Sequence, residues 1–394
     1  MINVHQYFSL NRTLLLIVGL WPYNKSKFAR FQLICCFSFL ITSIIFQITT
    51  FVTSKFTSEL MIKVLSFTFP MFSLTIKYNS FCVNSGTIKC LMEQLQQFCN
   101  DLRDNNEIAI VKRYGSNAKR YTKRLTMLIA SLIFISTFAQ LWPDFHDIFL
   151  SINKSRTHHL HIENEYFIDQ ERYFYLLLLH INASFYIGLL SLLATGTMLI
   201  AYLQYACGMF TIASYRIKNT MKVYTMLQCN NFQNKNLVCK SIIYAVNIHR
   251  KAIKFSQYLI TNFEISFMLL IVSGVITLSL NILRTLQIVT TKFNFEEFST
   301  TVLITLISVV YMFLSNFFGQ EITDHYNYLF VAAYNVPWYN APIHIQRLIL
   351  LLMQRGNKSF GLNVGGLFVA SLQCFATLMN TSLSYFTVMY SVQK

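Results

Sequence analysis

Few side chains in this chain have the types and spacing of a catalytic or metal-binding site. His158, His159 and His161 cluster beside Glu163 and Glu165, and imidazole and carboxylate groups are common zinc ligands. A solvated loop is the simpler interpretation of this polar cluster. The apolar stretches contain no His-x-x-x-His pair, nucleophile elbow, phosphate-binding loop or paired carboxylates. We therefore expect that the chain is not an enzyme and uses neither a metal nor a cofactor.

The composition indicates a helical membrane protein. Hydrophobic residues make up 54% of the chain, charged residues only 12%, and the mean hydropathy is +0.44. Soluble domains are about 25% charged. Alternating segments of the kind that form membrane barrels are absent. The net charge of +16 comes from basic residues between the apolar stretches, so it orients the protein and does not indicate nucleic-acid binding.

Uncharged windows predict seven membrane-spanning helices, an all-α fold in one domain. We expect them at about 31–54, 60–80, 125–143, 173–215, 260–284, 298–325 and 364–392. The uncharged part of the second span, residues 64–76, is short, so Lys63 and Lys77 at its ends are expected to snorkel to the membrane surfaces. The fourth window could be two passes or one very long helix, and its length alone does not decide this. Within it, His180 is expected to be neutral and hydrogen-bonded.

Loop charge predicts the orientation. With one pass per window, 24 of the 32 Lys and Arg residues fall on one side of the membrane. The positive-inside rule places that side in the cytoplasm, with the N-terminus inside and the C-terminus outside. A second crossing in window 173–215 would remove this asymmetry. None of the nine Cys residues falls in an outer loop, so no outer disulfide is expected, and Asn153 is a candidate glycosylation site outside.

Two inner segments have the pattern of cytosolic helices. Leu91, Leu95, Phe98 and Leu102 recur at helical spacing within 88–102. After Cys239, apolar residues including Ile243 and Ile253 are expected on one helix face, with His249, Arg250 and Lys254 mostly on the other. We expect these extensions to form an anchor bundle beneath the membrane.

The last segment is the most distinctive part of the chain. Residues 359–393 carry no charge, yet they are rich in Ser, Thr, Asn and Gln. A helix with that composition is expected to face other protein or water within a membrane assembly.

The motifs around this segment resemble a known family. They are Ala333-Tyr334, Pro337-Trp338-Tyr339, a short helix expected at Ile343–Met353, Gly365-Gly366, and Ser384-Tyr385-Phe386-Thr387. This set resembles the C-terminal signature of insect odorant receptors, and the length, seven spans and orientation are similar across the whole chain. The stretch Glu165–Glu171 resembles tuning receptors of ants, bees and wasps, and the long second cytosolic insertion of the shared co-receptor is absent.

The resemblance implies the odorant-binding tuning subunit of a ligand-gated, non-selective cation channel. It implies a heterotetramer with the co-receptor in the plasma membrane of olfactory sensory neurons, in contact with membrane lipid. The spanning part of the last segment would then lie near residues 366–390 and line the pore. By motif position, a hydrophobic gate would fall on Val388 and Val392, with Ser391 at a polar pore-lining place.

The resemblance also implies an apolar odorant pocket in the outer half of the membrane. The candidate ligand-binding residues are Phe67, Met71, Phe72, Phe134, Phe138, Trp142, Tyr186, Ile187 and Tyr311. Plain core packing is the alternative interpretation for each of them, since aromatic residues are common in membrane bundles. At the level of function, the alternatives are a transporter of small apolar solutes and a G-protein-independent receptor without a pore of its own. A transporter predicts inverted repeats, and the chain shows none.

Overall fold

Helices make up almost all of the computed structural model, which describes residues 6–149, 164–169, 172–227, 232–291, 293–356 and 358–393. In chain order they are α1 (Ser9–Ile17), α2 (Lys27–Ile48), α3 (Thr50–Thr53), α4 (Ser58–Val83), α5 (Ser85–Asp101), α6 (Asn105–Phe149), α7 (Phe174–Leu227), α8 (Phe232–Thr290), α9 (Phe295–Tyr334), the 3-10 turn η2 (Trp338–Asn340), α10 (Ile343–Gly356) and α11 (Leu372–Gln393). Strands β1 (Asn363–Val364) and β2 (Phe368–Val369) form a short hairpin. The fold is all-α, as expected.

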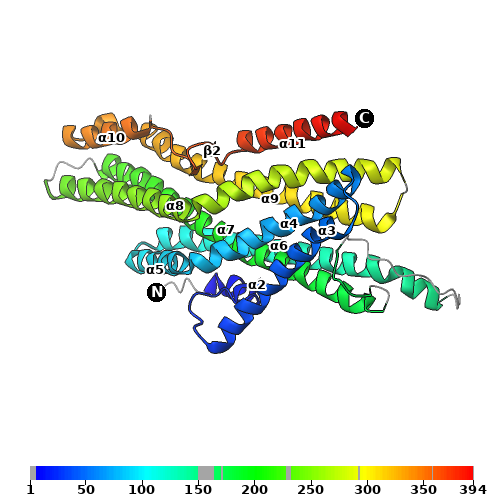
Figure 1. Cartoon of the computed structure of the whole chain (residues 1–394). Coiled ribbons are helices and arrows are strands. Elements are labelled where there is room, and N and C mark those ends of the chain that lie inside the picture. Colours follow the sequence, from blue (N-terminus) through cyan, green and yellow to red (C-terminus); the bar gives the residue numbers. More distant parts are fainter. Residues whose placement is uncertain are drawn as a thin grey trace.

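Four helices are much longer than a bilayer crossing requires. α6, α7, α8 and α9 contain 45, 54, 59 and 40 residues. At ~1.5 Å per residue, α7 is ~80 Å long, whereas a hydrocarbon core is ~30 Å thick. Figure 1 shows the resulting elongated bundle. The long window at 173–215 is therefore one uninterrupted helix, because no proline or turn divides it.

Five helices are long and apolar enough to cross a membrane by length and composition, when the described residues are searched. They contain the expected windows at 31–54, 60–80, 173–215, 260–284 and 298–325. The other two windows, 125–143 and 364–392, fall on α6 and α11. The search left out the part of window 125–143 whose side chains lie outside the described part of the structure, and Ser, Thr and Asn lower the hydropathy of α11.

The last helix begins later than the sequence predicts. α11 starts at Leu372, not near residue 364 or 366. The preceding residues turn instead: Gly365 and Gly366 have φ values of 63° and 70°, a region that favours glycine. Asn363 pairs with Val369, and Val364 with Phe368. The helix predicted at Ile343–Met353 is present as α10.

α7 forms the centre of the core and contacts α1, α2, α4, α6, α8 and α9. Small buried residues such as Ala194, Ala206 and Ala213 let these neighbours approach closely. The larger Tyr202 is fully buried, and its hydroxyl donates a 2.8 Å hydrogen bond to the carbonyl of Ile88 on α5. The core thus continues from the spanning region into the helical extensions.

The predicted amphipathic pattern is confirmed on α5, where Leu91, Leu95 and Phe98 are buried. The corresponding prediction for α8 is wrong at Ile243, which is 45% exposed, and at His249, which is only 2% exposed. Its ring lies 5.3 Å from that of Tyr326 and 5.6 Å from that of Phe330, both on α9. Because α7, α9 and α10 all pack on α8, that helix has no single solvated face.

A proline and an asparagine join α4 to α8. Pro70 has no N–H to donate to the carbonyl of Ser66, four residues earlier in α4. Asn281 of α8 donates a 2.9 Å hydrogen bond to that carbonyl instead. Near the start of α4, Lys63 forms a 3.0 Å ion pair with Glu297, which also contacts Arg284 at 2.6 Å. These contacts hold α4, α8 and α9 together.

Candidate functional site

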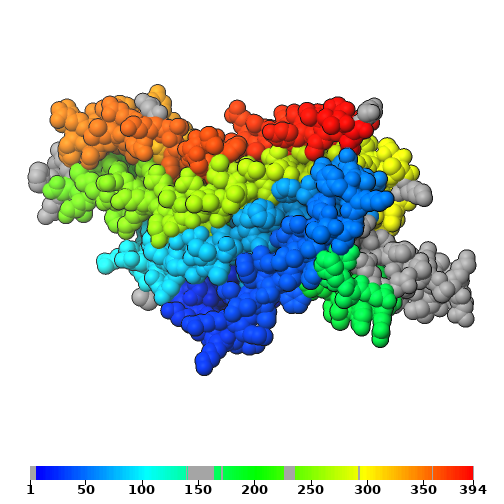
Figure 2. Space-filling view, in the orientation of Figure 1, coloured from blue at the N-terminus to red at the C-terminus, as the bar shows by residue number. Residues whose placement is uncertain are grey.

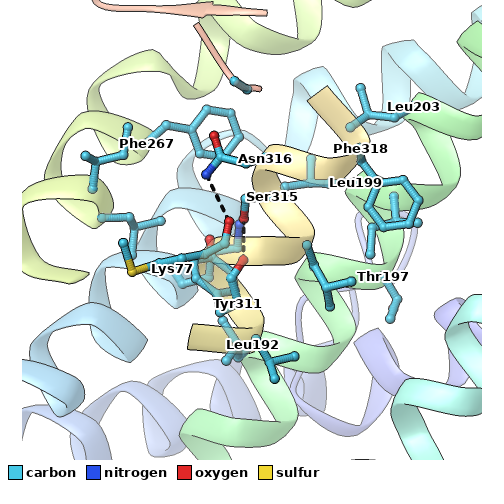
Figure 3. A pocket seen from close by; sticks show the side chains of 18 of the residues that line it. Lys77, Leu192, Thr197, Leu199, Leu203, Phe267, Tyr311, Ser315, Asn316 and Phe318 are labelled. Atoms are coloured by element: carbon cyan, nitrogen blue, oxygen red, sulfur yellow. Dashed lines mark hydrogen bonds between the residues drawn. The ribbon is translucent and has the colours of Figure 1, made fainter. Parts of the chain in front are cut away.

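An apolar cavity of about 320 Å³ lies beside the middle of α9. Its walls come from α4, α6, α7, α8 and α9, with the β-hairpin and α11 closing one side. Figure 3 shows Leu192, Leu199 and Leu203 on α7 and Phe267 on α8 lining it. The volume lies at the lower end of the ~300–1,000 Å³ range of small-molecule pockets, which are mostly apolar. Such a cavity suits a small apolar ligand.

A second, smaller cavity of about 60 Å³ adjoins the first. It is lined by Pro70, Phe185 and Leu189, and it shares Tyr311 and Met312 of α9 with the larger cavity. The two cavities thus lie next to each other among α4, α7, α8 and α9, and Tyr311 lines both.

Most polar groups of the larger cavity are satisfied within the protein. The Asn316 side chain donates to the carbonyl of Met312 at 2.9 Å and accepts from the backbone N–H of Ser371 at 3.2 Å. Ser315 donates to the carbonyl of Tyr311 at 2.9 Å, as Figure 3 also shows. These bonds leave those side chains little capacity to bind a polar ligand.

Lys77 is the exception, and the expectation that it snorkels is wrong. The residue is only 2% exposed and lines the cavity. Its Nζ lies 5.3 Å from the ring centre of Phe267, 5.7 Å from that of Tyr311 and 6.0 Å from that of Phe81. The side chain turns into the bundle because these three faces attract a cation there.

α11 supplies part of the cavity wall through Cys374 and Leu378. It is also tied to its neighbours by hydrogen bonds. The Ser279 hydroxyl of α8 donates to the carbonyl of Ser382 at 2.9 Å, and Asn316 of α9 holds Ser371 just before the helix. Two residues of α11 thus face the space that a ligand in the cavity would occupy.

Most of α11 is not covered by the rest of the chain. Leu378 and Ser382 are its buried residues, and the helix packs on α8 and α9. Figure 2 shows it along one edge of the molecule. Val388 and Val392 are 58% and 80% exposed, one helical turn apart on the same face, and Ser391 beside them is also exposed.

The other candidate ligand residues are scattered. Phe67 and Met71 are buried in the core, where Phe67 lies 6.0 Å from Phe185, whereas Phe72 points outward and is 43% exposed. Tyr311 lines both of the cavities described above. The structure therefore does not bring these candidates together in one cavity.

A groove of about 540 Å³ between α6 and α7 shares Ile129 and Leu193 with the first cavity. It is also lined by Phe134 and Phe138, which are 71% and 47% exposed. Tyr186 shares a 2.6 Å hydrogen bond with Thr137 at this groove, and its neighbour Ile187 is half-buried. The side chain of Trp142, on α6, is outside the described part of the structure, and so is Asn153.

His180 is hydrogen-bonded through both ring nitrogens, as expected for a histidine inside a helix bundle. Thr42 of α2 lies 3.0 Å from its Nε2, and the Tyr166 hydroxyl lies 2.9 Å from its Nδ1. A search of the described residues finds no group of three His, Cys, Asp or Glu side chains placed to hold a metal ion. The cluster of His158, His159 and His161 lies outside those residues.

Sequence comparison finds one family and one curated relative. The family model described as 7tm Odorant receptor matches residues 57–383. Odorant receptor 10 of Aedes albopictus is 30% identical over 88 residues, which cover 21% of this chain and 24% of that protein. The aligned region is thus about a quarter of that relative.

Structure comparison covers almost the whole chain. The insect olfactory receptor OR5 of Machilis hrabei, solved in complex with eugenol, has a TM-score of 0.76 and 16% identity, covering 99% of this chain and 98% of that one. The structure of the same receptor described without eugenol has a TM-score of 0.75 and covers 98% of each chain. At this identity the similarity shows a shared fold.

Proposed function

The chain belongs to the insect odorant receptor family, and from this premise we propose that it is the tuning subunit of an odorant-gated cation channel. Members of the family are multi-pass membrane receptors and not enzymes. The proposed channel is a non-selective heterotetramer with a co-receptor subunit. It acts in the plasma membrane of olfactory sensory neurons. The lack of a long second cytosolic insertion supports the tuning role over the co-receptor role.

The proposed topology has seven crossings, made by α2, α4, α6, α7, α8, α9 and α11. The N-terminus is cytosolic and the C-terminus extracellular, so the long extensions of α6 to α9 form a cytosolic anchor bundle. The distribution of 24 of the 32 Lys and Arg residues supports this orientation. Glycosylation of Asn153 would follow from it.

The odorant site in this proposal is the cavity around Tyr311. In the proposed topology it extends towards the cytosolic ends of α4 and α9, and so lies deeper than the outer-half pocket that the resemblance implies. The observation that carries the proposal is that Cys374 and Leu378 of α11 form part of its wall. A ligand that contacts α11 differently in two channel states shifts the balance between them. Burial of apolar surface supplies the binding free energy, at ~25 cal/mol per Å². Phe67 and Met71, which are buried on α4, would act on the site through packing, and the outward-facing Phe72 is not assigned to it.

The groove between α6 and α7 supports a secondary role for the remaining candidates. Phe134, Phe138, Trp142, Tyr186 and Ile187 lie on the helices that border it. Because its two phenylalanines are so exposed, we assign this groove to the ligand's entry route or to lipid, and the cavity around Tyr311 to odorant binding.

The pore in this proposal is lined by α11 from each of four subunits. Val388 and Val392 form the hydrophobic gate and Ser391 a polar ring next to it. The exposed face of α11 within one chain supports a contact with other subunits or with a water-filled path. Rings of apolar side chains close a pore by excluding water.

The test is odorant-evoked current in cells that express this chain with a co-receptor. Tyr311→Ala removes the aromatic wall between the two cavities, so we expect the half-maximal odorant concentration to rise by roughly tenfold, equivalent to ~1.4 kcal/mol. Tyr328→Ala on the same helix is the control, since Tyr328 is 47% exposed and lies outside both cavities. Equal effects of the two substitutions would contradict the assignment of the cavity.

A further inference from the structure

Lys77 is a basic side chain buried in an otherwise apolar cavity. It lies in the second half of α4, and its Nζ faces the rings of Phe81, Phe267 and Tyr311. Figure 3 shows Lys77 with Phe267 and Tyr311 at the cavity. No residue that the structure describes forms a hydrogen bond or an ion pair with that nitrogen. Buried charges are costly unless they are paired, and ionisable groups inside membrane bundles usually mark a functional site.

The surrounding aromatic rings compensate for only part of this cost. Their faces attract a cation, but they do not accept the three N–H bonds of a lysine as oxygen atoms do. Lys77 therefore retains hydrogen-bonding capacity directed at the cavity, and a ligand with an oxygen acceptor can use it.

The neighbouring polar groups do not supply the missing acceptor. The Asn316 side chain is bonded to Met312 and Ser371, and Ser315 to Tyr311. Glu264, one turn before Phe267 on α8, accepts a 2.9 Å hydrogen bond from the backbone N–H of Gly365. The carboxylate on this side of α8 is thus used to hold the β-hairpin.

We propose that the cavity selects amphiphiles with an acidic head group, which pairs with Lys77, and an aliphatic tail, which lies against the leucines of α6 and α7. The proposal rests on the odorant site assigned above and names its ligand class. The acidic amphiphile can come from solution, as a free carboxylic acid, or from the membrane, as an acidic phospholipid. Both present an anion on an apolar chain.

The experiment measures binding to the purified full-length receptor in phosphatidylcholine nanodiscs. The probes are radiolabelled decanoic acid and decan-1-ol, which share a chain length and differ in the head group. We expect the acid to bind at least roughly tenfold more tightly than the alcohol, as for a hydrogen bond to a charged group. Lys77→Met keeps the length of the side chain and removes its charge, so the ratio of the two affinities should fall to about one. Lys77→Arg should keep the preference for the acid.

A wild-type receptor that binds both probes equally overturns the proposal, and so does an unchanged preference in Lys77→Met. The wild-type comparison decides the matter even if Lys77→Met fails to fold. Nanodiscs that contain phosphatidic acid identify the source of the ligand. If phosphatidic acid competes with decanoic acid, and Lys77→Met abolishes this competition, the ligand is a membrane lipid. If phosphatidic acid does not compete, the ligand is a soluble acid. If the receptor prefers the acid in a Lys77-dependent way but gives no odorant-evoked current, the proposed channel function is refuted. The assignment of Lys77 as the binding site for the acid would still hold.

Discussion

Gly319 offers a sharp test of how closely α9 approaches the segment that leads into α11. A Cβ atom at Gly319 would lie 2.6 Å from the carbonyl oxygen and 2.9 Å from the carbonyl carbon of Ala370, and it would also meet that residue's Cβ. The contacts include backbone atoms, so no side-chain rotation relieves them. Gly319→Ala must therefore move the hairpin and the start of α11 away from α9.

The size of the effect follows from two opposing terms. Replacing glycine by alanine within a helix ordinarily stabilises it by up to ~1 kcal/mol. Overpacking in a closely packed region costs ~1–3 kcal/mol. We expect a net loss of up to ~3 kcal/mol, which lowers the melting temperature, since ~1 kcal/mol moves the Tm of a large domain by ~2–4 °C.

Gly86 on α5 is the matched control, because a Cβ there meets nothing within 4 Å. Gly86→Ala should leave the Tm of the purified receptor unchanged or slightly raised. Gly319→Ala should lower it and also weaken the odorant-evoked current, because the displaced residues connect the cavity to α11. A Gly319→Ala receptor as stable as the Gly86→Ala receptor would refute the close approach.

Three further predictions rest on other parts of the molecule. Val388→Glu should change rectification or leak in voltage-clamp recordings of the co-expressed channel, and unaltered permeation would mean that Val388 does not line the pore. Arg216→Met should lower the free energy of unfolding by ~3–5 kcal/mol, because it leaves the buried Glu107 without the 2.8 Å hydrogen bond that Arg216 donates; a loss below ~1 kcal/mol would contradict this. Burial raises the pKa of Cys99 to about 12, so on the order of 10⁻⁴ of this thiol is ionised at pH 8, and mass spectrometry should find it alkylated far more slowly than the partly exposed Cys90.

The long helices could be predicted because their signals are local. Charge-free windows marked their apolar lengths, and loop charge argued for one helix at 173–215, which α7 confirms. The pattern of Leu91, Leu95 and Phe98 predicted a buried face on α5, since that helix is covered on one side only. On α8, with neighbours on several sides, the same reasoning failed at His249.

The cavity could not be predicted, because its determinants are distant in sequence. Lys77 faces inward owing to Phe81, Phe267 and Tyr311, which come from three helices. In the sequence, Lys77 is a basic residue at the end of an uncharged stretch, and a basic residue in that position more often snorkels to the membrane surface. The leucines and isoleucines of the wall are the same residue types that fill the core, so composition does not distinguish them.

Adjacent candidates illustrate the same limit on α4. Met71 is fully buried, whereas Phe72 is 43% exposed. Successive residues point about 100° apart on a helix, and the Ser and Thr residues of this span fall on opposite sides, so no single polar face shows which direction is inward. The late start of α11 was missed for a different reason, since the glycines that turn the hairpin lie within an uncharged stretch.

Inside-out patches from cells that express this chain with a co-receptor test the central claim most directly. The account predicts unitary cation-channel openings within milliseconds of odorant application, in a cytosolic solution without guanine nucleotides or ATP. Openings that require GTP, or no openings in patches where surface labelling detects the protein, would contradict it.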